Sequence, residues 1–141
     1  MDGKLFVKTF PDGRPIRIVS EEDSRRYLIV KANIQDKEYV LVNIYAPNKD
    51  KDLLEFFSSI QKLISDNDLD NEENVIINGN FNCPIDPLLD FNGGVLSPRR
   101  AVVERILCMQ SELDLIDIWR IRNPSMRSYT WSQRSPCVLC L

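Results

Sequence analysis

The chain has 141 residues, of which 43% are hydrophobic and 28% charged, with 21 acids against 18 bases and a net charge of −3. This composition is typical of one globular domain and argues against a protein that holds DNA mainly by neutralising phosphates. No apolar run approaches the roughly 20 residues of a membrane span and the N-terminus does not resemble a secretory signal, so we expect an intracellular protein without a membrane partner.

The first half of the chain predicts strands that alternate with turns. Two β-rich runs, 26–34 and 39–47, are separated by a short polar loop and predict a hairpin. Because both runs are apolar at nearly every position, we expect them to be buried on both faces.

A helix is predicted next, because apolar residues from Leu53 to Ile64 recur at three- and four-residue spacing. Asn48 or Asp50 would cap its N-terminus. The run 74–78 then predicts a buried strand, and strand, helix and strand together form a crossover unit.

A second helix is predicted over 97–113, with Ser97 as N-cap and Pro98 at the first helical position. The residues expected to face the core are Val102, Val103, Ile106, Leu107 and Leu113. The predicted fold class is therefore α/β, with helices packed on a sheet in a single domain over 1–141.

Four acids in the second half of the chain are interpreted as structural. Asp86 and Asp90 follow a strand within a loop, where turn chemistry is the favoured role over metal binding. Asp114 and Asp117 lie between apolar residues near a helix end and are read as capping or salt-bridging groups rather than a catalytic pair.

The end of the chain concentrates positive charge. Ile118–Leu141 contains four arginines and no acid, whereas Asp50–Asp90 contains ten acids and two lysines. Aromatic residues are interleaved with the basic ones: Trp119, Arg120, Arg122, Arg127, Tyr129, Trp131 and Arg134. The pattern fits contact with nucleic acid, but composition alone favours surface arginines beside core aromatics.

The four cysteines are Cys83, Cys108, Cys137 and Cys140. A lone CxxC in a chain without histidine does not supply the four ligands of a structural zinc site. We therefore expect free thiols, which we interpret as small buried hydrophobes plus a pair near the end of the chain.

Two predicted strands end in polar residues. One ends in Asn43–Asn48 and the other in Asn78–Asn82. If these strands are parallel neighbours, their tips meet at one edge of the sheet, where open α/β sheets bind ligands. Amides, a phenol and a glycine suit a phosphate, although asparagine is also a common turn residue and the pattern alone favours that simpler role.

A family resemblance shifts this balance. The segments "VNIYAPN" (42–48), "VIINGNFNCPIDPLLDFNGG" (75–94), "ELDLIDIWRIRNPSMRSYTWSQ" (112–133) and "SPCVLC" (135–140) carry it. Over about 27–140 the chain resembles the endonuclease/exonuclease/phosphatase superfamily, and within it the apurinic-type endonuclease domain of LINE-type non-LTR retrotransposons.

The resemblance implies a four-layer α/β/β/α sandwich, Mg²⁺-dependent hydrolysis of DNA phosphodiesters and a nuclear location. It implies catalytic or phosphate-contacting roles for Tyr45, Asn48, Asn80 and Asn82. It also places Thr130 near the DNA, and Arg127 and Trp131 become further nucleic-acid-binding candidates. No protein partner is implied.

The chain departs from the family pattern at position 80, where the family has a catalytic aspartate and this sequence has Asn80. An amide cannot ionise, so it cannot act as a general base, and it binds Mg²⁺ less well than a carboxylate. The family's metal-binding glutamate and its later aspartate and histidine motifs have no counterparts here. We therefore expect a domain truncated at both ends, with metal ligands unassigned and only marginal stability.

Three functional hypotheses follow. The first is a fragment of a DNA endonuclease whose activity is impaired. The second is a non-catalytic nucleic-acid-binding remnant, and the third is a decayed open reading frame without a selected function.

Overall fold

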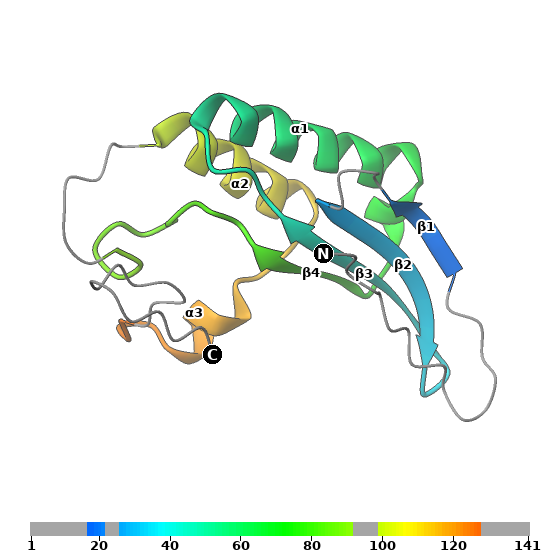
Figure 1. Ribbon diagram of the computed structural model, residues 1–141. Helices are drawn as coiled ribbons and strands as arrows, with labels where there is room; N and C mark the ends of the chain where they lie inside the picture. Colours follow the sequence, from blue (N-terminus) through cyan, green and yellow to red (C-terminus); the bar gives the residue numbers. More distant parts are fainter. Residues whose placement is uncertain (1–16, 22–25, 92–98, 128–141) are drawn as a thin grey trace, which may run out of the picture. The chain divides into compact units, whose positions relative to one another are not determined.

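The computed structural model describes residues 17–21, 26–91 and 99–127 (Figure 1). The chain divides into two compact units, and the boundary in the sequence lies between Asn82 and Cys83. No helix in the described ranges is both long and apolar enough to cross a membrane.

The first unit contains a four-stranded sheet, one α-helix and one short 3₁₀ helix. The elements in chain order are β1 (Arg17–Glu21), β2 (Tyr27–Ile34), β3 (Lys37–Tyr45), α1 (Asp50–Asp66), η1 (Leu69–Asn71) and β4 (Val75–Asn80). The strands lie in the order β1-β2-β3-β4, antiparallel except for the parallel pair β3 and β4. The predicted α/β class, hairpin and crossover unit are confirmed.

The hairpin between β2 and β3 has a two-residue turn. Gln35 and Asp36 have φ of 52° and 63°, the left-handed pattern of a type I′ turn, whose twist matches that of the strands it joins. The turn fixes the register from Ile34 opposite Lys37 to Tyr27 opposite Ile44.

Helix α1 covers one face of the sheet (Figure 1). The core consists of residues from that face and from the apolar side of the helix, chiefly Ile29, Val40, Val42, Ile44, Leu53, Phe57, Ile60 and Ile64. Along β3, buried residues alternate with half-buried or exposed ones. The prediction that both faces of the hairpin are buried is therefore wrong.

The second face of the sheet, opposite α1, carries Leu28, Val30, Leu41 and Ile76. The first three are half-buried and Ile76 is 45% exposed. Within 26–82 no helix lies over this face, because the unit's one α-helix is on the other side. These strands therefore carry more apolar residues than the described part of the first unit buries.

Two further predictions about the first unit are wrong. The N-cap of α1 is Lys49, without a side-chain cap, because Asp50 is already inside the first turn with Asp52, where acids favour the helix dipole. The strand 75–80 is not buried either. As the last strand of the described sheet, β4 has only one hydrogen-bonded neighbour.

The second unit contains α2 (Arg100–Glu112) and α3 (Ile118–Arg122). Helix α2 begins after an N-cap at Arg99, later than predicted, while Ser97 and Pro98 lie outside the described residues. Its buried residues are Val102, Ile106 and Met109.

The predicted core of the second unit is partly right. Val102 and Ile106 are buried, and Val103 and Leu113 are half-buried. Leu107 is 45% exposed because it lies about 100° around the helix from Ile106, and Met109 takes the next inward position.

Gly79 generates the first testable prediction. It has a φ of +124°, and a Cβ there would lie 1.9 Å from the carbonyl oxygen of Ile44. Gly79→Ala should lower the free energy of unfolding by more than about 2 kcal/mol, from strain plus overpacking, in a urea titration. Asn78→Ala, one residue earlier and exposed, is the control and should stay within about 0.5 kcal/mol of wild type. Equal effects would contradict the steric explanation.

Candidate functional site

The polar ends of β3 and β4 meet at one edge of the sheet, as the crossover predicts. Asn43 lies opposite Asn78, and Tyr45 lies opposite Asn80. Partners in register project from the same face, which here is the second face, away from α1. All four side chains are exposed, Tyr45 to 55%. We call Asn43, Tyr45, Asn78 and Asn80 the amide–phenol cluster.

Asn80 and Asn82 also shape the loop that leaves β4. The Asn80 side-chain oxygen accepts a hydrogen bond from the Asn82 backbone N–H at 2.9 Å. The Asn82 amide donates to the Ala46 carbonyl oxygen, and the Ala46 N–H donates to the Asn80 carbonyl oxygen at 2.8 Å. Asn82 has a φ of 48°, which asparagine tolerates well. The interpretation of these residues as turn residues is therefore confirmed.

An aromatic contact with α1 also stabilises this loop. The Phe81 ring stacks on Phe57 of α1, with centroids 5.7 Å apart and planes inclined by 20°. The loop after β4 is thus held by two contacts. Phe81 packs on the core residue Phe57, and Asn82 donates a hydrogen bond to Ala46.

Asn48 is not part of the ladder. It is exposed and comes just before Lys49, the N-cap of α1. The pairing of β3 with β4 ends at Tyr45 and Asn80, three residues before Asn48.

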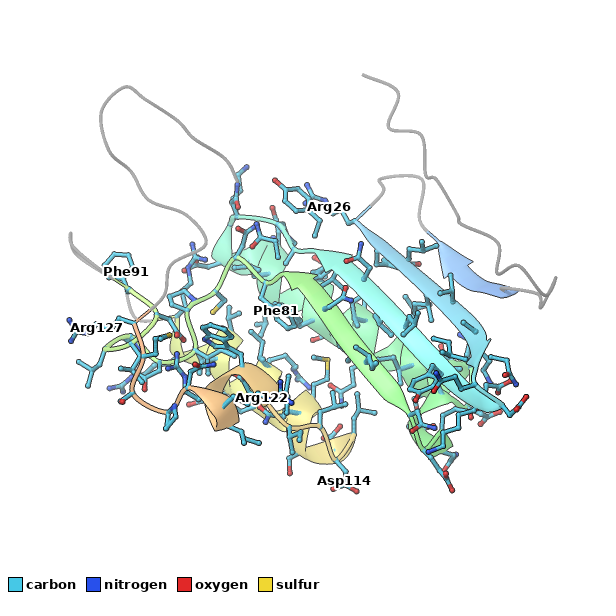
Figure 2. All side chains as sticks on the ribbon, turned by 90° about the horizontal axis from the view of Figure 1, so that it is seen from below. Arg26, Phe81, Phe91, Asp114, Arg122 and Arg127 are labelled. Atoms are coloured by element: carbon cyan, nitrogen blue, oxygen red, sulfur yellow. The ribbon has the colours of Figure 1, made fainter. Side chains whose placement is uncertain are left out.

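Arg26 adds a positive charge that the sequence reasoning missed. Its carbonyl oxygen accepts from the Tyr45 N–H at 2.7 Å, and its guanidinium Nη1 donates to the Tyr45 carbonyl oxygen at 3.5 Å. It precedes Tyr27, the partner of Ile44, so it lies beside Tyr45 in the ladder (Figure 2). A two-residue turn at Gln35 and Asp36 fixes which residues of the two strands are opposite each other. Extending that register along the hairpin would have placed Arg26 opposite Tyr45.

A magnesium ion does not fit the donors of this cluster. Amides and a phenol line it, whereas Mg²⁺ is held in proteins mainly through carboxylates and water. In the described part of the chain, no three acidic, cysteine or histidine side chains gather at one place.

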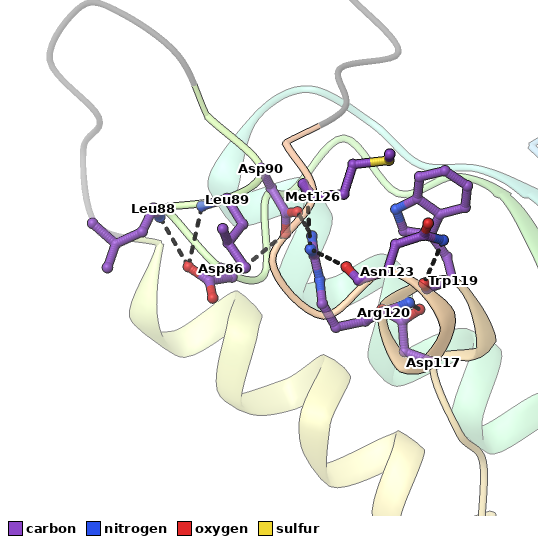
Figure 3. A network of polar contacts seen from close by, with 9 residues as sticks. All are labelled: Asp86, Leu88, Leu89, Asp90, Asp117, Trp119, Arg120, Asn123 and Met126. Carbon is purple, nitrogen blue, oxygen red and sulfur yellow. Dashed lines mark hydrogen bonds and ion pairs between the residues drawn. The ribbon is translucent and has the colours of Figure 1, made fainter.

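Asp86 and Asp90 stabilise the loop that opens the second unit (Figure 3). Asp86 Oδ1 accepts from the backbone N–H groups of Leu88 and Leu89, at 2.9 and 3.3 Å. The Asp86 N–H donates to Asp90 Oδ2 at 2.9 Å. The prediction of turn chemistry is confirmed.

Arg120 connects this loop to the segment after α3. Its guanidinium forms an ion pair with Asp90 and donates to the carbonyl oxygens of Asn123 and Met126 at 3.1 and 3.0 Å (Figure 3). Asp117 caps α3 by accepting from the Arg120 N–H at 2.8 Å, as predicted. Asp114, with a φ of 49°, follows the C-cap of α2 and ends the helix through its backbone.

The predicted nucleic-acid-binding residues are only partly within the described ranges. Arg127 and Arg122 are exposed, and Trp119 is 49% exposed, so this aromatic is not a core residue. Thr130 and Trp131 lie outside the described residues. Arg120 is held by its structural contacts rather than directed to solvent.

The cysteines in the described ranges are free, as predicted. Cys83 is only half-buried and Cys108 is exposed, so the expectation that these thiols are buried is wrong. A hydrogen bond to Glu112 raises the pKa of the Cys108 thiol, which disfavours the reactive thiolate. Cys137 and Cys140 lie outside the described residues.

Comparison with known proteins supports a transposon relationship. The chain is 29% identical over 107 residues to the transposon TX1 uncharacterized 149 kDa protein of Xenopus laevis. The matched segment covers 75% of this chain and 8% of that protein, so the chain spans a small part of its relative. No protein-family model matches the sequence.

The Arg120–Asp90 pair generates the second prediction. Both side chains are mostly shielded from solvent, with Arg120 24% and Asp90 29% exposed. Asp90→Asn would leave the charge of the guanidinium without its carboxylate partner. The free energy of unfolding should therefore fall by about 1–3 kcal/mol in chemical denaturation. Asp114→Asn makes the same change at an exposed position of the unit and should be nearly neutral. Equal stability of the two variants would show that Arg120 does not need this carboxylate.

Proposed function

We propose that the chain is a fragment of a retrotransposon-encoded, Mg²⁺-dependent DNA endonuclease of the endonuclease/exonuclease/phosphatase type, with an impaired catalytic centre. Its sheet would be one half of a four-layer sandwich that acts on phosphodiesters in the nucleus. The main support is the parallel ladder that brings Tyr45 and Asn80 together at the carboxyl edge of the sheet. The transposon relative supports the origin.

The amide–phenol cluster suits a phosphodiester in polarity. The Tyr45 phenol and the amides of Asn43 and Asn78 are hydrogen-bond donors that phosphate oxygens can accept. Asn80 keeps the acceptor oxygen that an aspartate would have, but it cannot take a proton from water. The cluster therefore has groups that position a phosphate and lacks the group that would start its hydrolysis.

The incompletely buried apolar residues of the second face support the sandwich. Leu28, Val30, Leu41 and Ile76 give the second face the composition of an internal layer. A second sheet packed on that face would bury them and would leave the amide–phenol cluster at the rim between the layers.

A nucleic-acid-binding remnant is the second candidate function. Arg26 specifically favours it, because a cation beside Tyr45 attracts a phosphate without any catalytic carboxylate or metal. In this interpretation, the chain still binds nucleic acid although it no longer hydrolyses phosphodiesters.

Asn80→Asp tests the enzymatic proposal. Wild-type protein should not nick supercoiled plasmid in Mg²⁺ above background. Asn80→Asp retains the acceptor for the Asn82 N–H while adding an ionisable group, so the nicking rate should rise by about 10²–10⁴-fold.

Asn78→Asp is the matched control, since it adds the same charge on the same face one register position away. It should not restore nicking. Nicking by wild type would contradict the impairment. A folded but inactive Asn80→Asp variant would show that Asn80 is not the sole cause of the inactivity, because the family's glutamate and its later aspartate and histidine also have no counterparts in the sequence.

Arg26→Gln tests the binding candidate. If Arg26 contacts a phosphate, the variant should bind duplex DNA more weakly, and the slope of log K against log salt should fall by about 0.9 in a fluorescence titration. Lys62→Gln removes an exposed cation from α1 and should leave the slope unchanged. Absence of wild-type binding at low salt would overturn this candidate.

A further inference from the structure

The two edges of the sheet differ in how they are protected. Edge β1 contains Arg17 and Glu21, and its register with β2 shifts between Ile18 and Ser20. Edge β4 has the sequence VIINGN and pairs regularly with β3 from Val75 to Asn80. Charges and bulges are the devices that keep sheet edges from pairing, and β4 has neither, nor a proline.

The outer backbone groups of β4 can be assigned. The carbonyl oxygens of Asn74 and Asn80 accept from Val40 and Ala46 N–H groups. Since alternate residues of a parallel strand bond to the same neighbour, the groups of Val75, Ile77 and Gly79 point away from β3. No strand in 17–21, 26–91 or 99–127 pairs with that side.

We propose that β4 pairs antiparallel with β4 of a second copy of the chain, so that the two sheets become continuous. With the two-fold axis at Ile77, the two Ile77 residues exchange hydrogen bonds and Val75 meets the second copy's Gly79. The outward groups at alternate positions are self-complementary in this arrangement.

Side-chain chemistry favours a second copy as the occupant. The strand carries no charge, so self-pairing places no like charges opposite each other. On the second face, Ile76, now 45% exposed, would lie across from the second copy's Asn78 and lose contact with water. A charged partner peptide would find no ion pair along this edge.

Analytical ultracentrifugation over a concentration series tests the proposal. The weight-average mass of the full chain should rise from 16.4 kDa toward twice that value. Hydrogen exchange at the Ile77 amide should slow as the dimer forms, whereas the Asn78 amide, already directed to β3, should change little.

Two variants locate the contact. Val75→Pro removes an outward N–H at the first residue of the strand, and Ile76→Lys puts a charge on the edge; both should be monomeric. Leu88→Lys, at a 75% exposed position of the second unit, should dimerise as wild type does.

A monomer at every concentration would overturn the proposal. A dimer that both folded β4 variants retain would overturn it as well, and circular dichroism spectra establish that each variant is folded.

Discussion

The parallel contact between β3 and β4 is the constraint on which the rest of the first unit depends. At Gly79 the two backbones approach so closely that a Cβ would overlap the carbonyl oxygen of Ile44. This approach sets Asn80 opposite Tyr45 and aligns the ends of both strands at one edge. Glycine is thus needed for the geometry of the cluster, although it contributes no chemical group to it.

The role of Asn80 in the loop explains how the fold tolerates an amide at this position. The backbone N–H of Asn82 needs an acceptor, and either an amide or a carboxylate oxygen provides one. Replacing an aspartate by asparagine therefore leaves the turn intact and removes only the ionisable group. Asparagine and aspartate at this position would therefore support the same loop, and they differ only in whether the side chain can ionise.

Local sequence signals predicted the hairpin and the crossover because turn residues and apolar periodicity act over a few neighbours. They failed where the outcome depends on distant elements. Apolar residues on both faces of β2 and β3 predict burial, but burial requires a covering layer that 26–82 supplies on one side only. Likewise, the three apolar residues that open β4 do not reveal that it is the last strand of the described sheet. The candidate site was found from the polar strand ends, and Arg26 was missed because its position depends on the register rather than on any motif.

The three asparagines after the apolar part of β4 have different roles. Asn82 is committed to the backbone, through its left-handed φ and its bond to Ala46. Asn80 uses its side-chain oxygen to accept the hydrogen bond of the turn. Asn78, opposite Asn43, projects beside them from the exposed second face. The exposed polar side chains at this edge are therefore those of Asn43, Tyr45, Asn78 and Asn80, whereas Asn82 is part of the loop that holds them in place.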